Sequence, residues 1–106
     1  MERLHRSTDI ASMFTEVKPQ YMGPFQIYIR PNKVSHTRAG IIISKNHIPL
    51  AVKRNRLRRQ LRELIHMSIT GKTSTYDILI LVRRCIKEED YSQISQQVLN
   101  SIITLT

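Results

Sequence analysis

The sequence has few of the features that define several protein classes. Cys85 is its only cysteine, which excludes an internal disulfide and a multi-cysteine zinc site. We expect Cys85 to be a passive residue at a strand end rather than a reactive thiol. The longest apolar runs are about five residues, whereas a membrane-spanning helix needs about 20. No apolar stretch follows the N-terminus as it would in a secretory signal. We therefore expect a cytoplasmic protein that does not span a membrane.

The sequence also lacks the residue patterns of known active sites. It has no carboxylate cluster, no glycine-rich phosphate loop and no nucleophile signature, and its four histidines stand far apart at His5, His36, His47 and His66. Asp77 is a lone acid at a predicted strand start, which is typical of a turn or cap residue more than of a metal ligand. The length of 106 residues suits one domain. We expect a single domain without a complete active site.

Acidic residues are missing from the whole middle of the chain. The sequence has 17 Lys and Arg against 8 Asp and Glu, a net charge of +9. Residues 1–16 and 63–106 are nearly neutral, so the excess lies in residues 17–62, which contain eleven bases and no acid. Six of these bases fall within residues 53–62. Since 41% of the residues are hydrophobic, the chain can bury a core. It is predicted to be a folded domain that binds a polyanion.

The first third of the chain predicts a helix and two strands. A helix starting near the capping residues Ser7, Thr8 and Asp9 is expected to end before Pro19. Residues 25–30 alternate between an apolar face and a face of Gln, Tyr and Arg, which indicates a half-exposed strand. Residues 39–45 are rich in β-branched residues and predict a second, more buried strand. The simplest pairing of the two strands is a hairpin.

The rest of the chain predicts helix, strand and helix. Helical periodicity runs from Pro49 to a stop at Gly71, with an apolar face of Leu57, Leu61, Leu64, Ile65 and Ser68. Residues 77–83 are almost continuously apolar, as in a central strand covered on both faces. A last helix follows the acids at 88–90, with an apolar stripe of Tyr91, Ile94, Val98, Leu99, Ile102 and Ile103. The order α-β-β-α-β-α predicts an α+β domain with a parallel β-α-β unit.

The helix after Pro49 presents a basic surface opposite its leucines. Asn55, Arg59, Arg62 and His66 share the outer face, which Arg56 and Arg58 flank. Cations in the first turns of a helix are unfavourable by about 0.3 to 1 kcal/mol each, so local stability does not explain Lys53 and Arg54. A solvated face is the simpler alternative, but such a face usually mixes charge signs. Guanidinium groups bind phosphates in a bidentate way and stack on bases, and Asn55 can read a base edge or hold an arginine. The pattern favours a nucleic-acid surface.

Three segments in order resemble the protein component of bacterial ribonuclease P. They are RAGIIISK at 38–45, AVKRNRLRRQLRE at 51–63 and DILILVR at 77–83. The centre of the resemblance is Arg54-Asn55-Arg56, and the similarity spans nearly the whole chain. It implies one RNA-binding domain over residues 1–106, a small mixed sheet packed with helices. It further implies a sandwich like domain 2 of ribosomal protein S5, with a left-handed β-α-β crossover, although the general rule for such crossovers is right-handed.

The resemblance implies a protein subunit that carries no catalytic group and no metal site of its own. A catalytic RNA partner with bound Mg²⁺ would hydrolyse the phosphodiester bond and remove the 5′ leader of precursor tRNA. The residues implied to dock on that RNA are Lys53, Arg54, Asn55, Arg56, Arg58, Arg59 and Arg62. Those implied for a cleft that holds the single-stranded leader are Phe14, Tyr28, Arg30 and Lys45. Simple core packing remains an alternative for Phe14.

The sequence departs from the family pattern at several leader-cleft positions. Ile10 replaces a second aromatic residue, Ile42 a small hydroxyl residue and Asn46 a second lysine, and the usual glycine after the first helix is absent. Two other functions compete with the leading hypothesis of a ribonucleoprotein subunit. One is a ribosomal or other structured-RNA binding protein, and the other is a stand-alone nuclease. Charge alone does not separate the ribonucleoprotein subunit from the structured-RNA binding protein.

Overall fold

The computed structural model describes residues 2–4, 6–71, 74–84 and 91–105 of the chain. It contains five strands and three helices in these ranges. They are β1 (Glu2–Arg3), α1 (Ser7–Glu16), β2 (Gln20–Met22), β3 (Phe25–Pro31), β4 (Arg38–Ile43), α2 (Ala51–Ile69), β5 (Tyr76–Val82) and α3 (Tyr91–Leu105). The predicted α-β-β-α-β-α order is confirmed, with β1 and β2 added to it. Cys85 and the acids at 88–90 lie outside the described residues.

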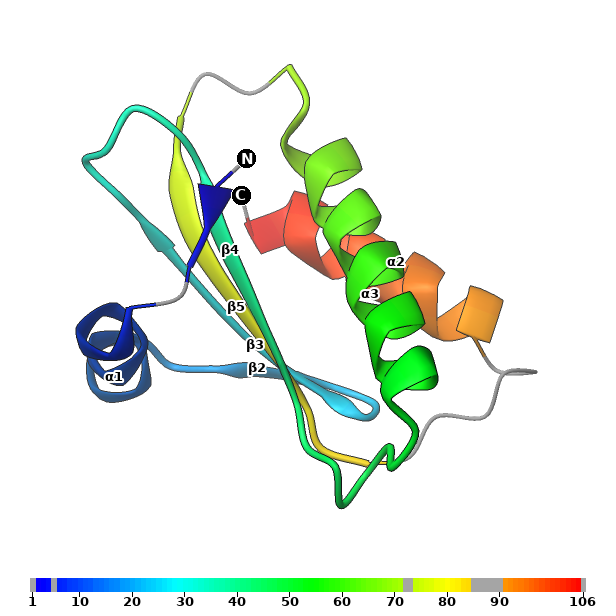
Figure 1. The fold of residues 1–106 in the computed structure, drawn as a ribbon. Coiled ribbons are helices and arrows are strands. Elements are labelled where there is room, and N and C mark those ends of the chain that lie inside the picture. Colours follow the sequence, from blue (N-terminus) through cyan, green and yellow to red (C-terminus); the bar gives the residue numbers. More distant parts are fainter. Residues whose placement is uncertain (1, 5, 72–73, 85–90, 106) are drawn as a thin grey trace.

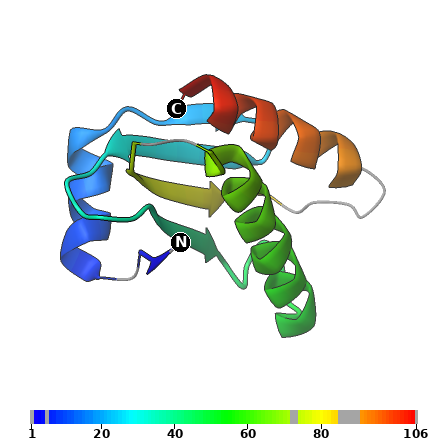
Figure 2. The same cartoon turned by 90° about the horizontal axis from the view of Figure 1, so that it is seen from above.

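The elements form three layers, with one mixed sheet between two helical layers. Figure 1 shows α1 on one face of the sheet and the pair α2 and α3 on the other. Seen from above in Figure 2, α2 and α3 spread over their face while α1 lies beyond the opposite one. The strand order is β1-β4-β5-β3-β2. The predicted small mixed sheet packed with helices is confirmed.

Strand β5 occupies the centre of the sheet, as its apolar sequence predicts. It pairs in parallel with β4 and antiparallel with β3, so that Leu79 lies between Gly40 and Tyr28. The parallel β4-α2-β5 unit is confirmed, but the expected hairpin of β3 with β4 is wrong. Strand β5 is apolar on both faces, so it is most stable at the centre of the sheet, where helices cover both of its faces. Strands β3 and β4 therefore lie on opposite sides of β5.

Strands β1 and β2 were not predicted, because two and three residues are too short to show a period. A local signal for β2 does exist. Met22 pairs with Phe25, so Gly23 and Pro24 form a two-residue turn. Gly23 has a φ of 53°, which suits the first position of a tight hairpin turn. The Gly23-Pro24 pair is thus the sequence feature that marks this hairpin.

The helices differ from the predictions at their N-termini. The first residue of α1 is Ser7, Arg6 is its N-cap, and no side chain caps it; the expected Ser, Thr or Asp cap is therefore wrong. Helix α2 begins at Ala51 after the N-cap Leu50, so Pro49, where the helical pattern was predicted to begin, lies before the helix. Gly71, with a φ of 83°, follows the end of α2 as predicted.

The core lies mainly between the sheet and the pair α2 and α3. Helix α2 buries Leu57, Leu61, Ile65 and Ser68, with Leu64 packed beside them, which confirms its predicted apolar face. In α3, Val98 and Ile102 are fully buried and Ile94 packs against the same cluster. Ile103 is largely exposed, so the expected stripe is narrower than predicted. The side chain of Tyr91 lies outside the described residues.

A second, smaller core lies between the sheet and α1. It joins Leu4, Met13, Tyr28 and Leu79. The polar face of β3 is therefore not half-exposed as predicted: Gln26 and Tyr28 are both buried. Alternation in a sequence shows which side chains share a face, but not whether another element covers that face. Here α1 covers it, because Met13 is itself fully buried against it.

Candidate nucleic-acid interface

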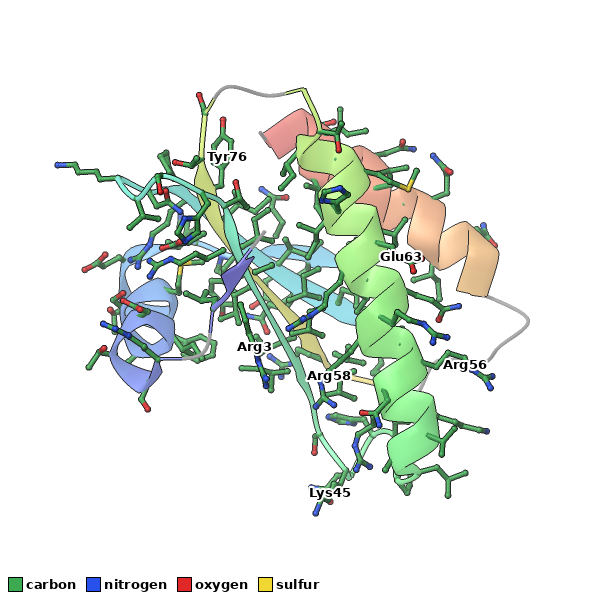
Figure 3. The ribbon with its side chains drawn as sticks, turned by 45° about the horizontal axis from the view of Figure 1, so that its top comes forward. Arg3, Lys45, Arg56, Arg58, Glu63 and Tyr76 are labelled. Atoms are coloured by element: carbon green, nitrogen blue, oxygen red, sulfur yellow. The ribbon has the colours of Figure 1, made fainter. Side chains whose placement is uncertain are left out.

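An open groove of about 980 Å³ runs along the outer side of α2. It is lined by Arg3, Asn55, Arg58, Arg59, Arg62, Glu63, His66 and Met67. Four arginines thus face one acid among the lining residues. Figure 3 shows Arg3 of β1 close to Arg58 on the same side of the helix. Arg3 was not predicted from the sequence, because its place in the groove depends on the parallel pairing of β1 with β4.

The groove brings together four of the seven residues expected to dock on RNA, namely Asn55, Arg58, Arg59 and Arg62. Arg58 donates from Nη1 to Oδ1 of Asn55 at 3.4 Å, so Asn55 does hold an arginine in place. Arg58 and Arg62 are half-buried while Arg59 is exposed. The guanidinium group of Arg58 is therefore partly held by Asn55 before any ligand binds.

The other three residues lie elsewhere on α2. Nη1 of Arg54 donates to the backbone oxygens of Ile48 and Pro49 at 2.8 and 2.7 Å. Arg54 thus ties the loop before α2 to the helix, a contact that the sequence did not indicate. Arg56 points to the opposite side of α2 from Arg58 in Figure 3, and Lys53 is exposed in the first turn. The basic residues of 53–62 therefore lie on both sides of α2 rather than on one shared face.

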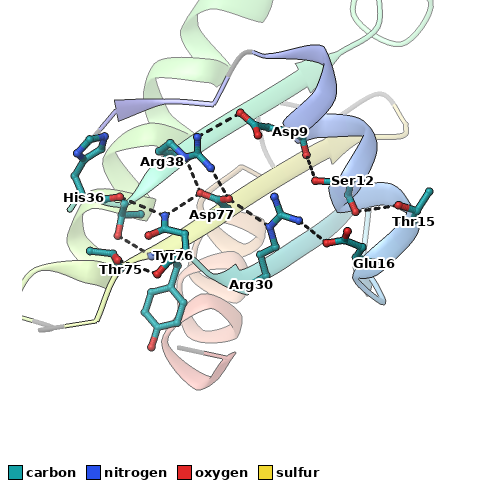
Figure 4. A network of polar contacts seen from close by, with 12 residues as sticks. Asp9, Ser12, Thr15, Glu16, Arg30, His36, Arg38, Thr75, Tyr76 and Asp77 are labelled. Carbon is teal, nitrogen blue, oxygen red and sulfur yellow. Dashed lines mark hydrogen bonds and ion pairs between the residues drawn. The ribbon is translucent and has the colours of Figure 1, made fainter. Parts of the chain in front are cut away.

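A buried carboxylate joins three strands on the α1 face of the sheet. Asp77 is 1% exposed and accepts hydrogen bonds from Arg38, Asn32 and Arg30. The same two arginines reach α1: Arg38 pairs with Asp9 at 3.3 Å and Arg30 with Glu16 at 2.9 Å. Figure 4 shows this network from β4 through β5 and β3 to the helix. Asp77 was expected to be a turn or cap residue, and this expectation is wrong. It is the centre of an ion-pair network.

The network determines the protonation of Asp77. Burial by itself raises the pKa of this carboxyl group, but the hydrogen bonds from Arg38 and Asn32, with the charge of Arg38 and a bond from Arg30, outweigh it. The net result is a pKa below the usual value of an aspartate. Asp77 therefore stays ionised at neutral pH and fixes α1 over the sheet through the two arginines.

Three rows of side chains cross the α1 face of the sheet. The first is the ion-paired row Arg38-Asp77-Arg30, and the second is Gly40-Leu79-Tyr28 beneath α1. The third is Ile42-Leu81-Gln26-Tyr21. Ile42 and Tyr21 at its two ends are 39% and 71% exposed. This third row is therefore the open part of the face, next to α1.

The four residues expected at the tRNA leader do not form one cluster. The rings of Phe14 and Tyr28 meet edge to face, with centroids 5.3 Å apart. Phe14 is 44% exposed, which argues against simple core packing, whereas Tyr28 is buried beneath it. Arg30 belongs to the first row and is held by Asp77 and Glu16. Lys45 follows β4 beyond the third row and is exposed (Figure 3).

A series of side-chain hydrogen bonds lies along the third row and was not predicted from the sequence. Gln26 donates from Nε2 to the hydroxyl oxygen of Tyr28 at 2.8 Å and lies 3.4 Å from that of Tyr21. Its Oε1 accepts from Nη1 of Arg83 at 2.7 Å. Burial is the main cause that raises the pKa of Tyr28, and the electrostatic interaction with Tyr21 raises it further. The positive charge of Arg83 lowers it. The net pKa of Tyr28 is above the ordinary value, so its hydroxyl is neutral at physiological pH.

Within residues 2–4, 6–71, 74–84 and 91–105, no group of three or more His, Cys, Asp or Glu side chains is placed to hold a metal ion. In the same part of the chain, no helix has the length and apolar character required to cross a membrane.

Comparison with known proteins assigns the family. The family model described as Ribonuclease P matches residues 1–105. The chain belongs to the ribonuclease P protein family. The structure agrees with this assignment: the ribonuclease P protein of Staphylococcus aureus superposes with a TM-score of 0.80 at 24% identity, over 99% of this chain and 94% of that one. The protein from Thermotoga maritima gives a TM-score of 0.76 at 22% identity, over 100% and 99%.

The sequence is also similar to curated proteins named "Ribonuclease P protein component". The protein from Azotobacter vinelandii is 34% identical over 68 residues, which are 64% of this chain and 52% of the relative. The match thus spans about half the length of that relative and of several others. The protein from Clostridioides difficile is 29% identical over 100 residues, 93% of this chain and 87% of its own length.

Proposed function

We propose that this chain is the protein subunit of a ribonuclease P, an endoribonuclease that removes the 5′ leader of precursor tRNA. Its partner is a catalytic RNA, which binds along the groove beside α2. The observation that supports this most directly is the groove itself, where Arg3, Arg58, Arg59 and Arg62 line one surface with a single acid, Glu63. The groove alone indicates an anionic partner, and membership of the ribonuclease P protein family supports the RNA of this complex as that partner.

The geometry of α2 suits the backbone of a folded RNA. Leu57, Leu61 and Ile65 anchor the helix in the core, so the arginines on its outer side project from a rigid support. Each guanidinium fork can bind two phosphate oxygens. Because Asn55 holds Arg58, less side-chain entropy is lost when a phosphate binds. Lys53, Arg54 and Arg56 then contact RNA that extends around the start of the helix.

The leader of the precursor tRNA binds on the α1 face of the sheet. Unpaired bases stack on exposed aromatic rings, and basic side chains contact their phosphates. Phe14 offers the exposed ring, which Tyr28 supports from below. Lys45 supplies a charge beyond the third row, while Arg30 acts mainly by holding α1 through Glu16. Mg²⁺ is held mainly by the RNA partner and supplies the hydrolytic chemistry, and no residue of this chain takes a catalytic role.

Reconstitution tests the proposal. The chain is mixed with ribonuclease P RNA and precursor tRNA at low Mg²⁺, and cleavage at the mature 5′ end is measured. We expect faster cleavage than with RNA alone and no cleavage by the chain alone. Binding to the RNA without stimulation would indicate a general structured-RNA binding protein instead. Cleavage by the chain without added RNA would indicate a stand-alone nuclease.

The salt dependence of RNA binding tests the electrostatic part of the proposal. If about six phosphates are neutralised, the logarithm of the affinity falls with the logarithm of the salt concentration at a slope of about −4 to −5. The slope is measured by titrating labelled catalytic RNA with the protein at several salt concentrations. An affinity independent of salt would contradict binding through the arginines of α2.

A further inference from the structure

Tyr21 has an unusual position at the edge of the sheet. It lies on β2 directly opposite Gln26 of β3 and is 71% exposed. Its hydroxyl oxygen lies 3.4 Å from the amide nitrogen of Gln26, which ties the exposed ring to a side chain that is 5% exposed. A tyrosine hydroxyl needs a protein partner chiefly when it is buried, so this contact is not required to satisfy the exposed Tyr21.

The orientation of the Gln26 amide follows from its neighbours. The guanidinium of Arg83 can only donate hydrogen bonds, so the atom of Gln26 that it contacts at 2.7 Å is the carbonyl oxygen. The amide nitrogen therefore faces the two tyrosines, and both phenol oxygens accept from it. A phenol oxygen that accepts a hydrogen bond still has its own hydrogen to donate. Tyr21 consequently presents a hydroxyl donor and an open ring at the surface.

The open ring of Tyr21 is linked to the exposed ring of Phe14 through buried side chains. Phe14 contacts Tyr28, Tyr28 binds Gln26, and Gln26 binds both Tyr21 and Arg83. The two exposed rings thus stand at the ends of one connected chain, with the exposed Arg83 beside it. Strands β2 and β3 also belong to the acid-free stretch of the sequence. A surface with two rings, a donor and a cation matches an unpaired nucleotide strand, which has stacking faces, acceptor atoms and phosphates.

We propose that Tyr21 forms an additional binding position for one unpaired nucleotide of the precursor-tRNA leader, beyond the position at Phe14. The base stacks on the Tyr21 ring, the Tyr21 hydroxyl donates to an acceptor of that nucleotide, and Arg83 contacts a neighbouring phosphate. Gln26 acts as the positioning residue, since it fixes both the ring and the cation. This inference rests on the proposed function, because it takes the leader as the occupant.

The test uses the reconstituted complex and precursor tRNAs whose leaders are lengthened one nucleotide at a time. Single-turnover cleavage at increasing enzyme concentration gives the half-saturating concentration for each leader. We expect Tyr21→Ala to raise this concentration about 5- to 160-fold, the range for loss of one stacked base. The effect should begin at one leader length and stay constant for longer leaders. Tyr21→Phe keeps the ring and should lose about 2- to 10-fold at the same lengths, since one hydrogen bond is removed.

Gln97→Ala is the matched control, because Gln97 is exposed on α3, across the sheet from Tyr21. It should behave like the wild type at every leader length. If Tyr21→Ala also matches the wild type at every length, the extra position does not exist. An equal loss at all leader lengths, the shortest included, would assign Tyr21 to folding or assembly and would also overturn the proposal. A wild-type complex that ignores leader length would instead overturn leader binding on the α1 face, and with it the position at Tyr21, while cleavage itself would still support a ribonuclease P subunit.

Discussion

Asp77 of β5 and Arg38 of β4 form a bidentate ion pair, and the two residues lie directly opposite each other on neighbouring strands. Nε and Nη2 of Arg38 each donate to a different carboxylate oxygen of Asp77, both at 2.8 Å. The remaining nitrogen of Arg38, Nη1, reaches Asp9 on α1 at 3.3 Å. One buried acid of the central strand thereby determines where α1, and with it Phe14, lies over the sheet.

Asp77→Asn should destabilise the protein strongly. The substitution leaves the guanidinium groups of Arg38 and Arg30 without their shared anion in a largely buried site. We expect the free energy of unfolding to fall by about 2 to 4 kcal/mol, somewhat below the range for a fully buried pair, because both arginines keep partial access to water. Urea unfolding at neutral pH measures it. Glu16→Gln is the control, since this acid is 65% exposed, and its pair with Arg30 should contribute less than about 1 kcal/mol.

The pH dependence of stability should follow the lowered pKa of Asp77. An acid whose pKa is lower in the folded state than in the unfolded state stabilises the fold at pH values above its unfolded pKa, which is about 3.9. That contribution is lost as the pH falls through the folded pKa. The free energy of unfolding should therefore be nearly constant around pH 6 and decrease below about pH 4. Urea unfolding between pH 2.5 and 7 should show a steeper decrease for the wild type than for Asp77→Asn; equal slopes would contradict this role.

The local part of the fold follows from the sequence, whereas the pairing of distant strands does not. The buried face of α2 could be predicted because Leu57, Leu61 and Ile65 recur at helical spacing. The central place of β5 could be predicted because its residues are apolar on both faces. The hairpin prediction failed because nearness in sequence favours β3 with β4, but the parallel β-α-β unit brings β5 between them. The polar face of β3 is buried because α1 covers it, and the sequence of β3 alone does not indicate that a helix lies there.

The candidate site shows the same division. The arginines on the outer side of α2 were visible as an acid-free run, and four of the expected RNA-docking residues do line one groove. Arg3 and Arg83 were missed because each reaches its partners through strand pairing between distant parts of the chain. The backbone contacts of Arg54 were missed because side-chain rotamers decide whether a surface arginine faces solvent or folds back onto the chain.

Arg54→Ala and Arg59→Ala should separate folding from RNA binding. Arg54 donates to the backbone oxygens of Ile48 and Pro49, so its removal should lower the free energy of unfolding by about 1 to 2 kcal/mol and also weaken RNA binding. Arg59 is exposed in the groove, so its removal should leave stability within about 0.5 kcal/mol. It should reduce affinity for the catalytic RNA and make the salt slope shallower by about one unit.

Urea unfolding and RNA titration on the same protein preparations measure both effects. Thr104→Ala is a suitable control, since Thr104 is exposed near the end of α3 and should leave RNA affinity unchanged. A loss of stability in Arg59→Ala as large as in Arg54→Ala would contradict the division, because it would mean that the groove arginine also supports the fold.

Gly40→Ala should detach the N-terminal segment from the sheet. A Cβ atom at Gly40 would lie 2.8 Å from the backbone oxygen of Leu4 and 3.2 Å from a side-chain carbon of Leu79. The segment that carries Arg3 would have to move, so we expect a loss of about 1 to 3 kcal/mol in unfolding free energy. We also expect weaker RNA binding, because Arg3 leaves the groove. Thermal unfolding and RNA titration measure the two effects.

Gly71→Ala is the matched control for this prediction. Gly71 has a φ of 83° and open space around the position of a Cβ atom, so alanine costs only backbone strain, about 1 to 2 kcal/mol. At a temperature where both variants remain folded, Gly71→Ala should bind the catalytic RNA like the wild type while Gly40→Ala binds more weakly. Equal RNA affinities in the two variants would show that the position of the N-terminal segment does not matter for the groove. In that case the arginines of α2 alone would account for binding.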